Sequence, residues 1–285
     1  MKLAVVVLNY NDAETTGAFL QHIQDYSLVE KIIVVDNAST DDSFEQLQVF
    51  KNEKTDLIRT KENGGYGKGN NYGIQYAMKA YQPEYLVVSN PDIIFEESLL
   101  QEMLEFVAAS QEKIGMVTAT MLNPDGTKAR NTWKMRTART CISENLFLLN
   151  RFRKGTQYPQ EHFSGSNSEV DIISGAFFMI HSETMKNIGM FDERTFLYWE
   201  EDILGYKLKE QNYKSFILNQ SSFIHNHSVS ISKNIQSLEK KLDLAEDSKR
   251  LYMKEYLKVG KVLTLLEKCS YFIGKKSYLL VKRKR

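Results

Sequence analysis

The sequence has few of the residues that build covalent frameworks or cross membranes. Its 285 residues include two cysteines, Cys141 and Cys269, whose wide separation matches no metal-binding spacing. We expect both to be buried free thiols in the reducing environment of the cytoplasm. No apolar run reaches the roughly 20 residues that span a bilayer, and the run at Met1–Leu8 is too short for a signal peptide. We therefore expect a soluble or peripheral protein.

The chain also has no large excess of charge, because its net charge is +1. Residues 261–285 hold eight Lys or Arg and one acid, Glu267, whereas residues 1–260 hold 29 basic and 35 acidic residues. We expect no nucleic-acid partner for a body with this acidic balance. The tail mixes lysines with apolar clusters, which is typical of a helix that contacts an anionic membrane surface. The alternatives are a solvated helix packed on the body and a helix that packs against a second copy in a homodimer.

Apolar runs alternate with helical patterns in the first half of the chain. Three continuous runs have the pattern of parallel strands buried on both faces: Leu3–Leu8, Lys31–Asp36 and Tyr85–Ser89. The apolar spacing around them predicts three helices: Ala13–Tyr26, Asp42–Lys51 and Gly65–Ala80. This alternation predicts an α/β fold with a mostly parallel central sheet flanked by helices.

The second half has a less regular pattern. The spacing predicts two more helices and two more strands: Glu96–Ser110, Glu201–Gln211, Met116–Met121 and Asp171–Ile180. The turn-forming sequence Asn123–Gly126 predicts a hairpin that runs on to about Trp133. Residues 136–168 show no clear pattern.

From Ile235 the sequence has a helical pattern almost to its end, with interruptions near Gly260 and Gly274. We predict one domain over residues 1–232 and a helical, basic C-terminal extension over residues 233–285.

Polar side chains follow the first two predicted strands. Asn9 and Asn11 come after the first strand, and Asp36 and Asn37 stand at the end of the second. Ligands of open parallel sheets bind outside the carboxyl ends of the strands. An Asp in this place accepts a hydrogen bond from a ribose hydroxyl or a base N–H. The alternative for Asp36 is that it caps the following helix.

A glycine-rich segment, Asn63–Gly73, leads into the third predicted helix. Gly64 and Gly65 allow the backbone to come close to a ligand, and the N–H groups of the helix point at any anion there. Lys68 and Asn70 add polar side chains. The spacing fits neither the dinucleotide fingerprint nor the phosphate-binding loop that ends in Gly-Lys-Ser/Thr, which disfavours a dehydrogenase or an ATPase. A loop that only caps the helix is the alternative.

Asn90 and Asp92 follow the strand Tyr85–Ser89 in an Asn-Pro-Asp sequence, which is also an ordinary turn. A carboxylate at a strand end is suited to Mg²⁺ or Mn²⁺, because both prefer oxygen ligands and share their coordination with substrate phosphates.

Two further pairs of residues are candidates for chemistry. Glu201 and Asp202 stand at a helix start, where one could act as a general base, although the helix dipole alone favours acids there. His225 and His227 follow a strand and are candidate ligands of a metal or a diphosphate, although a single His is more often structural.

In this order, these motifs resemble the family 2 glycosyltransferases with a GT-A fold, particularly their bacterial rhamnosyltransferase-like branch. The resemblance covers about residues 3–230 and rests on six segments: 6–11, 34–41, 63–70, 90–92, 174–176 and 191–202. It implies that Asp36 holds the nucleotide with Asn11 near it. It also implies that Asp92 ends the family's Asp-x-Asp motif, which binds the Mg²⁺ or Mn²⁺ that bridges the diphosphate. His227 or His225 is the later ligand of the metal or the diphosphate.

The sequence departs from the family pattern at two places. Asn90 stands where the motif has its first Asp, which leaves Asp92 as the only carboxylate there. The family's Glu-Asp pair, whose Asp is the base, is Glu200-Glu201-Asp202 here. An alignment without gaps puts Glu201 at the base position, whereas chemical type favours Asp202, which we prefer here with Glu201 as the alternative.

The resemblance implies an inverting transferase that moves a sugar from a nucleotide diphosphate to an acceptor. A dTDP- or UDP-sugar is the expected donor, with rhamnose as the first candidate. The expected acceptor is a saccharide or a lipid-linked molecule in cell-surface polysaccharide synthesis, at the inner face of the cell membrane if the tail binds lipid. One alternative is a non-catalytic nucleotide-sugar-binding protein, which Asn90 makes plausible. A nucleotidyltransferase is disfavoured, since a Gly- and Arg-rich loop would follow its first strand.

Overall fold

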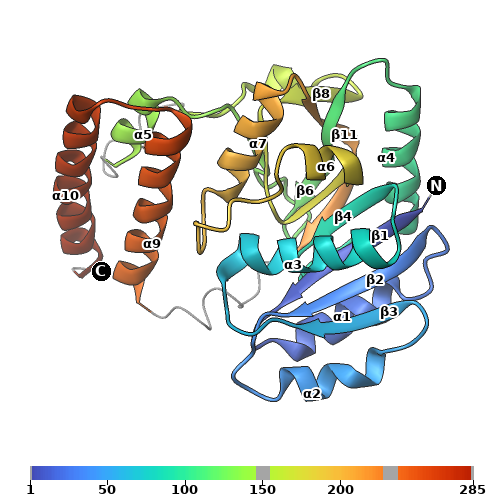
Figure 1. Cartoon of the computed structure of the whole chain (residues 1–285). Coiled ribbons are helices and arrows are strands. Elements are labelled where there is room, and N and C mark those ends of the chain that lie inside the picture. Colours follow the sequence, from blue (N-terminus) through green and yellow to red (C-terminus); the bar gives the residue numbers. More distant parts are fainter. Residues whose placement is uncertain (1, 146–154, 227–236, 284–285) are drawn as a thin grey trace.

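The computed structural model describes residues 2–145, 155–226 and 237–283. Within these residues, a nine-stranded sheet has the order β3-β2-β1-β4-β10-β6-β11-β5, and β8 pairs with β11 (Figure 1). Its strands are β1 (Leu3–Asn9), β2 (Val29–Asp36), β3 (Thr55–Arg59), β4 (Tyr85–Ser89), β5 (Ile93–Ile94), β6 (Ile114–Leu122), β8 (Asn167–Val170), β10 (Phe177–His181) and β11 (Lys214–His225). A separate two-stranded sheet pairs β7 (Thr132–Trp133) with β9 (Ile172–Ile173).

The four strands at one end of the large sheet are all parallel. Strand β1 pairs with β2 and β4, and β2 pairs with β3. Every residue of β4 and nearly every residue of β1 is buried, as expected for apolar strands that are covered on both faces. The register sets Asn9 opposite Asp36 and Asp36 opposite Arg59, so these polar residues lie together at one sheet edge.

The other half of the sheet is mixed. Strand β10 runs antiparallel to both β4 and β6, while β6 and β11 are parallel. The turn at Asn123–Gly126 is present, but the hairpin ends well before Trp133, with the bridge between Leu122 and Lys128 and the hydrogen bond from Ala129 N–H to the Met121 carbonyl. Trp133 instead pairs with Ile172. The single strand expected at Asp171–Ile180 is divided into β9 and β10, with the motif Ser174–Ala176 at the break.

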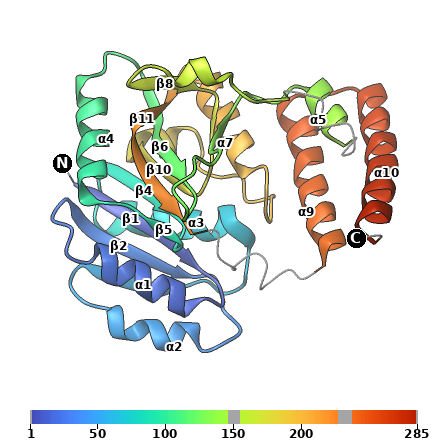
Figure 2. The ribbon, with the colours of Figure 1, turned by 180° about the vertical axis from the view of Figure 1, so that it is seen from behind.

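Helices cover both faces of the sheet (Figures 1 and 2). On one face, α1 (Ala13–Ile23), α2 (Ser43–Leu47) and α4 (Glu97–Ala109) contribute to an apolar cluster with β1, β2 and β6. On the other face, α3 (Gly65–Ala80), α6 (Ser182–Asn187) and α7 (Glu200–Glu210) build a second cluster. The prediction of helices that flank a central sheet is therefore confirmed.

The C-terminal residues form a helical unit beside the sheet. It contains α9 (Leu238–Leu251), a π-helical turn at Tyr252–Tyr256 and α10 (Lys261–Arg283), and it packs on the short helix α5 (Ala138–Glu144). A third apolar cluster joins α5, α7 and the π-helical turn through Cys141, Ile203 and Tyr252.

The predictions for the glycines and cysteines of the chain's second half can be compared with the structure. The expected interruption at Gly260 is present, but the one at Gly274 is wrong, because α10 continues through this residue. Cys141 is buried as expected, whereas Cys269 is exposed on α10, because it lies on the outward face of that helix. The predicted boundary after residue 232 falls outside the described residues. Within those residues, the structure contains no helix with the length and apolar character to cross a membrane.

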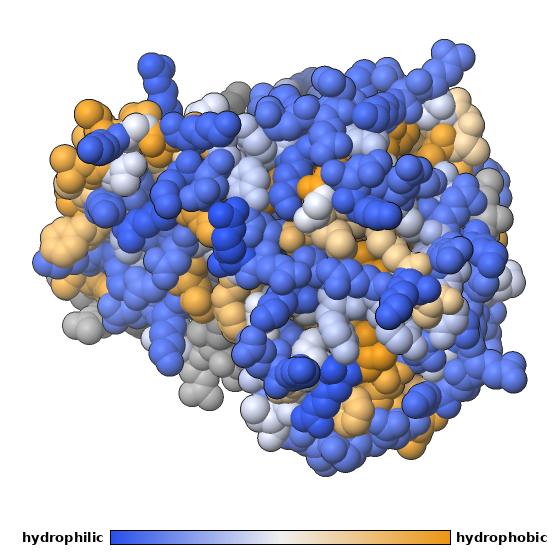
Figure 3. All heavy atoms as spheres, viewed as in Figure 1, coloured by the Kyte–Doolittle hydropathy of each residue, from blue (hydrophilic) through white to orange (hydrophobic). Residues whose placement is uncertain are grey.

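Buried charges connect the helices of this unit. Lys249 of α9 bonds Glu246 and Asn145, and its Nζ lies 3.3 Å from Oε1 of Glu267 on α10. Asn145, which follows α5, donates to the same Oε1 at 3.1 Å. All four side chains are buried, so the contact between α5, α9 and α10 is largely polar. Outward, by contrast, α10 presents apolar side chains (Figure 3).

Candidate active site

The carboxyl ends of β1, β2 and β3 carry a buried hydrogen-bond network centred on Asp36. Asn9 Nδ2 donates to Asp36 Oδ1 at 3.0 Å, and the backbone N–H of Ser39 donates to Oδ2 at 3.1 Å. Arg59 Nε lies 3.1 Å from the same Oδ2. Since the Asp36 side chain has no exposed surface, a ligand can reach its carboxylate only if Ser39 or Arg59 moves. In this state Asp36 fixes the loop that follows β2.

Asn11 and Asn37 hold neighbouring loops in place. Asn11 has φ +53°, a left-handed conformation that Asn adopts more readily than most residues, and its side chain exchanges hydrogen bonds with Thr40. Asn37 Nδ2 donates to Asn63 Oδ1 at 3.0 Å and to the Gly65 carbonyl at 3.2 Å. The loop after β2 and the glycine-rich segment are therefore joined directly.

The glycine-rich segment packs closely against the protein itself. Gly65 has φ +86°, and a Cβ at this position would overlap the backbone carbonyl of Phe196, which also accepts a hydrogen bond from Tyr66 N–H. Gly64 is the N-cap residue of α3. The ammonium group of Lys68 lies on the surface and pairs with Glu62 at 2.8 Å.

Three elements meet at the break between β9 and β10. Tyr66 of α3 donates its hydroxyl to the Gly175 carbonyl at 2.6 Å. Gly175 N–H donates to Glu201 Oε1 at 3.4 Å, and Asn90 N–H donates to the Ala176 carbonyl at 2.8 Å. We call these five residues the Gly175 junction. It brings together the glycine-rich segment, the Asn-Pro-Asp turn and the first turn of α7.

Asp92 and His225, two of the candidate metal ligands, lie side by side. Strand β5 pairs antiparallel with β11, which sets Ile93 opposite His225 and places Asp92 Oδ1 3.2 Å from His225 Nε2. A carboxylate and an imidazole are suitable donors for Mg²⁺ or Mn²⁺, with diphosphate oxygens to complete the shell. No group of three or more Asp, Glu, His or Cys is suited to a metal in the described parts of the chain, and His227 lies outside them.

The acids at the start of α7 have very different surroundings. Asp202 accepts hydrogen bonds from Arg136 Nη1 at 2.6 and 2.7 Å and from Trp133 Nε1 at 3.3 Å. Its side chain is 3% exposed, so it is a buried member of an ion pair. Glu201 makes no ion pair within 4 Å in the described residues, although the Arg136 charge acts on it from farther away, and its Oε1 accepts a hydrogen bond from Gly175 N–H at 3.4 Å. Glu200 is also buried, and its Oε2 has no hydrogen-bond partner there.

Burial shifts the titration of this region. It raises the pKa of Glu201, and the adjacent Asp202 acts in the same direction, while the Gly175 N–H opposes the shift. Burial also raises the pKa of Glu200 well above its ordinary value. For Tyr66, burial and then the nearby Glu200, Glu201 and Asp92 carboxylates raise the hydroxyl pKa well above its ordinary value. Tyr66 is therefore a neutral hydrogen-bond donor, and Glu201 is a carboxyl group whose proton affinity has been increased.

Two aromatic residues in a left-handed conformation precede α7. Tyr198 and Trp199 both have φ +69°, which is unfavourable for bulky side chains. The Trp199 ring lies 5.6 Å from that of Tyr252, and the Arg136 guanidinium lies 4.8 Å above it. These contacts hold the segment just before α7 in a conformation that costs energy, a feature that clusters at functional sites.

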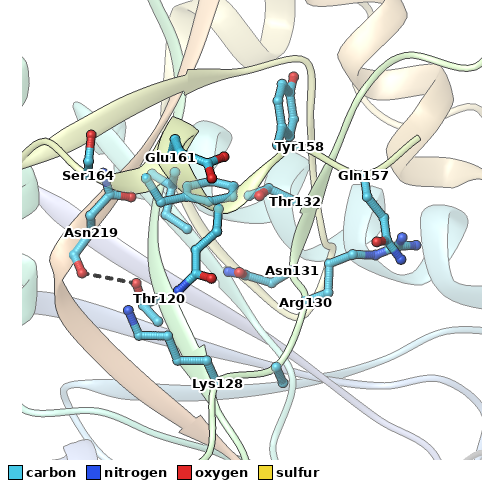
Figure 4. Close-up of a pocket in the computed structure, with 14 residues that line it drawn as sticks. Thr120, Lys128, Arg130, Asn131, Thr132, Gln157, Tyr158, Glu161, Ser164 and Asn219 are labelled. Carbon is cyan, nitrogen blue, oxygen red and sulfur yellow. Dashed lines mark hydrogen bonds between the residues drawn. The ribbon is translucent and has the colours of Figure 1, made fainter. Parts of the chain in front are cut away.

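A cavity of about 860 Å³ lies between the loop after β6 and the segment before β8. Tyr158, Glu161 and Ser164 form one side of it, and Lys128 and Arg130 lie on the other (Figure 4).

The floor of the cavity connects it to the Gly175 junction. The lining residue Asn131 accepts a hydrogen bond at its carbonyl from Ser174 N–H, one residue before Gly175. Because it has aromatic and cationic walls around polar groups, the cavity is suited to a polar ligand such as a saccharide.

Sequence reasoning missed three residues of this region. Tyr66 lies inside the quoted glycine motif, where an aromatic residue between glycines was a signal. Arg59 was not identified because its place depends on the register between β2 and β3. Arg136 came from the stretch without a pattern, and no local signal indicated its contact with Asp202.

The sequence model of the family described as "Glycosyl transferase family 2" matches residues 4–185. The chain belongs to this glycosyltransferase family. The resemblance read from the motifs is thereby confirmed, and so is the assignment as a glycosyltransferase.

Curated relatives of this glycosyltransferase have low identity. A low-salt glycan biosynthesis hexosyltransferase of Haloferax volcanii, Agl10, is 25% identical over 210 residues, which cover 74% of this chain and 62% of the relative. An N-acetylglucosaminyl-diphospho-decaprenol L-rhamnosyltransferase of Mycobacterium tuberculosis is 26% identical over 228 residues, covering 75% of this chain and 72% of that protein. The chain thus spans less than two thirds of the first relative.

A solved structure shows the fold. The mannosyltransferase PcManGT of Pyrobaculum calidifontis, in complex with GDP-Man and Mn²⁺, superposes with a TM-score of 0.60 at 13% identity. The match covers 99% of this glycosyltransferase and 75% of that chain. The predicted GT-A type α/β fold is therefore confirmed.

Proposed function

We propose that this glycosyltransferase transfers a hexosyl group, with rhamnose as the first candidate, from a dTDP- or UDP-sugar by an inverting displacement. The observation that carries the proposal is the Gly175 junction, which connects Glu201 through Gly175 and Ala176 to Asn90, in the turn that carries Asp92. The Glu201 and Asp92 carboxylates both act on the pKa of Tyr66 in that junction, and Asp92 lies beside His225. The rhamnosyltransferase relative supports the choice of sugar.

Glu201 is the proposed general base. A base must be free to accept the acceptor's proton, and Asp202 is held by Arg136 in a buried ion pair. Burial raises the pKa of both Glu201 and Asp202, so the ion pair with Arg136 is what distinguishes the two acids. Asp202 then has a positioning role, because its ion pair with Arg136 fixes the first turn of α7. The geometry thus supports the position given by the gapless alignment.

Asp92 and His225 would hold the divalent metal. When bound, Mg²⁺ or Mn²⁺ supplies positive charge that stabilises the leaving diphosphate. The Mn²⁺ in the PcManGT complex supports a metal of this kind. Asn90 contributes through its backbone N–H, which binds the Ala176 carbonyl and orients the turn that carries Asp92.

The proposed nucleotide site lies over the carboxyl ends of β1 and β2. Asn9 and Asp36 position the loops there, while Asn11 and Asn37 shape the surface toward the glycine-rich segment. From that segment, Gly64, Gly65, Lys68 and Asn70 remain proposed as nucleotide-binding residues. Lys68 could bind phosphate only by leaving Glu62, an exposed ion pair that costs little to break.

The acceptor is proposed to bind in the 860 Å³ cavity beside the Gly175 junction. A saccharide or the saccharide part of a lipid-linked molecule fits its polar lining, and Tyr158 offers a ring for a sugar face. We expect Tyr158→Ala to raise KM for the acceptor without changing KM for the donor. The proposed catalytic domain is residues 1–232, with residues 233–285 as an extension that packs on α7.

One experiment tests the proposal against a non-catalytic nucleotide-sugar-binding protein, which the Asn90 substitution favours. The purified protein is incubated with dTDP- and UDP-sugars with Mn²⁺, Mg²⁺ or a chelator, and released nucleotide diphosphate is measured. Metal-dependent release that Glu201→Gln abolishes supports transfer chemistry. Donor binding by thermal shift without release in any combination would show a binding protein instead.

A further inference from the structure

Helix α10 presents a concentration of apolar side chains to solvent. Among the described residues, twelve large apolar side chains are exposed, and seven of them belong to this one helix: Val262, Leu265, Leu266, Phe272, Ile273, Leu280 and Val281. Val262 is 73% exposed and Leu265 is 63% exposed. Figure 3 shows apolar atoms on the side of the molecule where α10 lies in Figure 1. A patch of this kind marks an interaction surface rather than chance exposure.

All of these exposed residues except Val281 form one continuous stripe. Their spacing of three, four and seven places them on one side of the helix, together with the exposed Cys269. On the opposite side, Glu267, Tyr271 and Gly274 are buried against the rest of the helical unit. The stripe, defined here as positions 262, 265, 266, 269, 272, 273 and 280, is therefore turned away from the protein body.

Lysines accompany the apolar stripe. Lys261 and Lys268 are exposed and seven residues apart, so they share a line along one border of the stripe. Lys276 is exposed within it, and its ammonium lies 4.1 Å from the centre of the Phe272 ring. The single acid of the helix, Glu267, is buried on the inner side. The outward surface of α10 is thus apolar and positively charged, with no negative group.

We propose that this surface of α10 docks on an anionic lipid membrane, with the stripe among the acyl chains and the lysines at the headgroups. This goes beyond the proposed transfer reaction, which does not depend on it. Opposite charge favours anionic lipid, and lysine side chains extend from apolar surface to the headgroup level. A second copy is a poorer occupant, because a symmetric contact sets identical patches against each other and would bring equal charges together.

Vesicle co-sedimentation tests the proposal on the full chain. The probes are vesicles of phosphatidylcholine alone and of phosphatidylcholine mixed equally with phosphatidylglycerol. We expect binding to the anionic vesicles that weakens at high salt, since each lysine contributes through a screened attraction. The double variant Leu265→Ser/Phe272→Ser should bind at least about tenfold more weakly, because it loses two large apolar groups.

Val49→Ser is the matched control, because Val49 is an exposed apolar residue, 81% accessible, far along the chain from α10. It should leave vesicle binding unchanged. Hydrolysis of the donor sugar in the absence of vesicles should be the same in all three proteins. Donor hydrolysis measures the proposed transfer site, whereas co-sedimentation measures membrane binding. The two proposals can therefore fail independently of each other.

Cys269 gives a second readout, since it lies in the stripe and is exposed. A water-soluble maleimide should label it in the free protein and more slowly once anionic vesicles are added. Absence of wild-type binding to anionic vesicles, or equal binding by the double variant, would overturn the proposal. Sedimentation that showed a lipid-free dimer, lost in the double variant, would assign the stripe to a second copy instead.

Discussion

Two isosteric substitutions at adjacent positions, Glu201→Gln and Asp202→Asn, should have opposite effects on stability and turnover. Glu201 makes no ion pair within 4 Å in the described chain, and burial raises its pKa, so an uncharged amide removes a desolvated charge at little cost to folding. Loss of a general base should lower kcat by roughly 10²- to 10⁴-fold. The free energy of unfolding should change by less than about 1 kcal/mol.

Asp202→Asn should act mainly on folding. It leaves the buried Arg136 with Glu144 alone, at 3.0 Å, as its anionic partner. Breaking a buried ion pair costs about 3–5 kcal/mol, and the remaining partner favours the lower value. For a chain of this size each kcal/mol lowers Tm by about 2 °C, so Tm should fall by about 6 °C.

The assay combines thermal melting with steady-state transfer kinetics on both variants. The pH profile adds a check: since the base must be deprotonated, kcat of the wild type should rise with pH through a pKa above 4.5, the ordinary Glu value. That rise should be absent from the residual activity of Glu201→Gln. If Glu201→Gln kept its turnover while Asp202→Asn lost turnover at an unchanged Tm, the assignment of Glu201 as base would be refuted.

Three further outcomes follow from the structure. Asp92→Asn should lower donor turnover at least about 100-fold and reduce the response to added Mn²⁺, which a metal titration would detect; an unchanged titration would contradict the metal assignment. Gly65→Ala, at φ +86° and against the Phe196 carbonyl, should destabilise by about 2 kcal/mol or more in urea unfolding; a melting curve like the wild type would argue against that close approach. Burial raises the pKa of Cys141 to about 12, so iodoacetamide at neutral pH should modify Cys269 and leave Cys141 intact until the protein unfolds.

The parts of the fold that the sequence predicted are those with strong local patterns. Strands β1 and β4 are continuous apolar runs, the pattern expected of parallel strands that are buried on both faces. The pairing of β7 with β9 was not predictable, because each contributes two residues and the partners are about forty positions apart. Gly274 was a poor signal of a break in α10, because small residues also occur where a helix packs closely on its neighbours.

In the candidate site, too, sequence motifs predicted the candidate residues but not their tertiary contacts. The family resemblance named Asp92 and either His225 or His227 as candidate ligands, but the contact between Asp92 and His225 comes from the pairing of β5 with β11. The choice between Glu201 and Asp202 did not follow from the motifs, because it depends on Arg136, which lies 66 positions before Asp202 in a region without periodicity. Local sequence reports which acids are present, but their cation partners are set by tertiary packing.

The polar contact between α5, α9 and α10 has a consequence for how this protein can be shortened. A chain ending at residue 260 would remove Glu267 and leave Lys249 and Asn145 at a newly opened surface, facing water without their carboxylate. Helix α5 closely follows Arg136 in the chain, and the Tyr252 hydroxyl donates to the Arg136 carbonyl. A shift of α5 would therefore disturb Arg136 and its ion pair with Asp202 of α7. Deleting α10 would therefore change both membrane binding and the support of the candidate active site. Point substitutions on the outward face of α10 change membrane binding and leave that support intact.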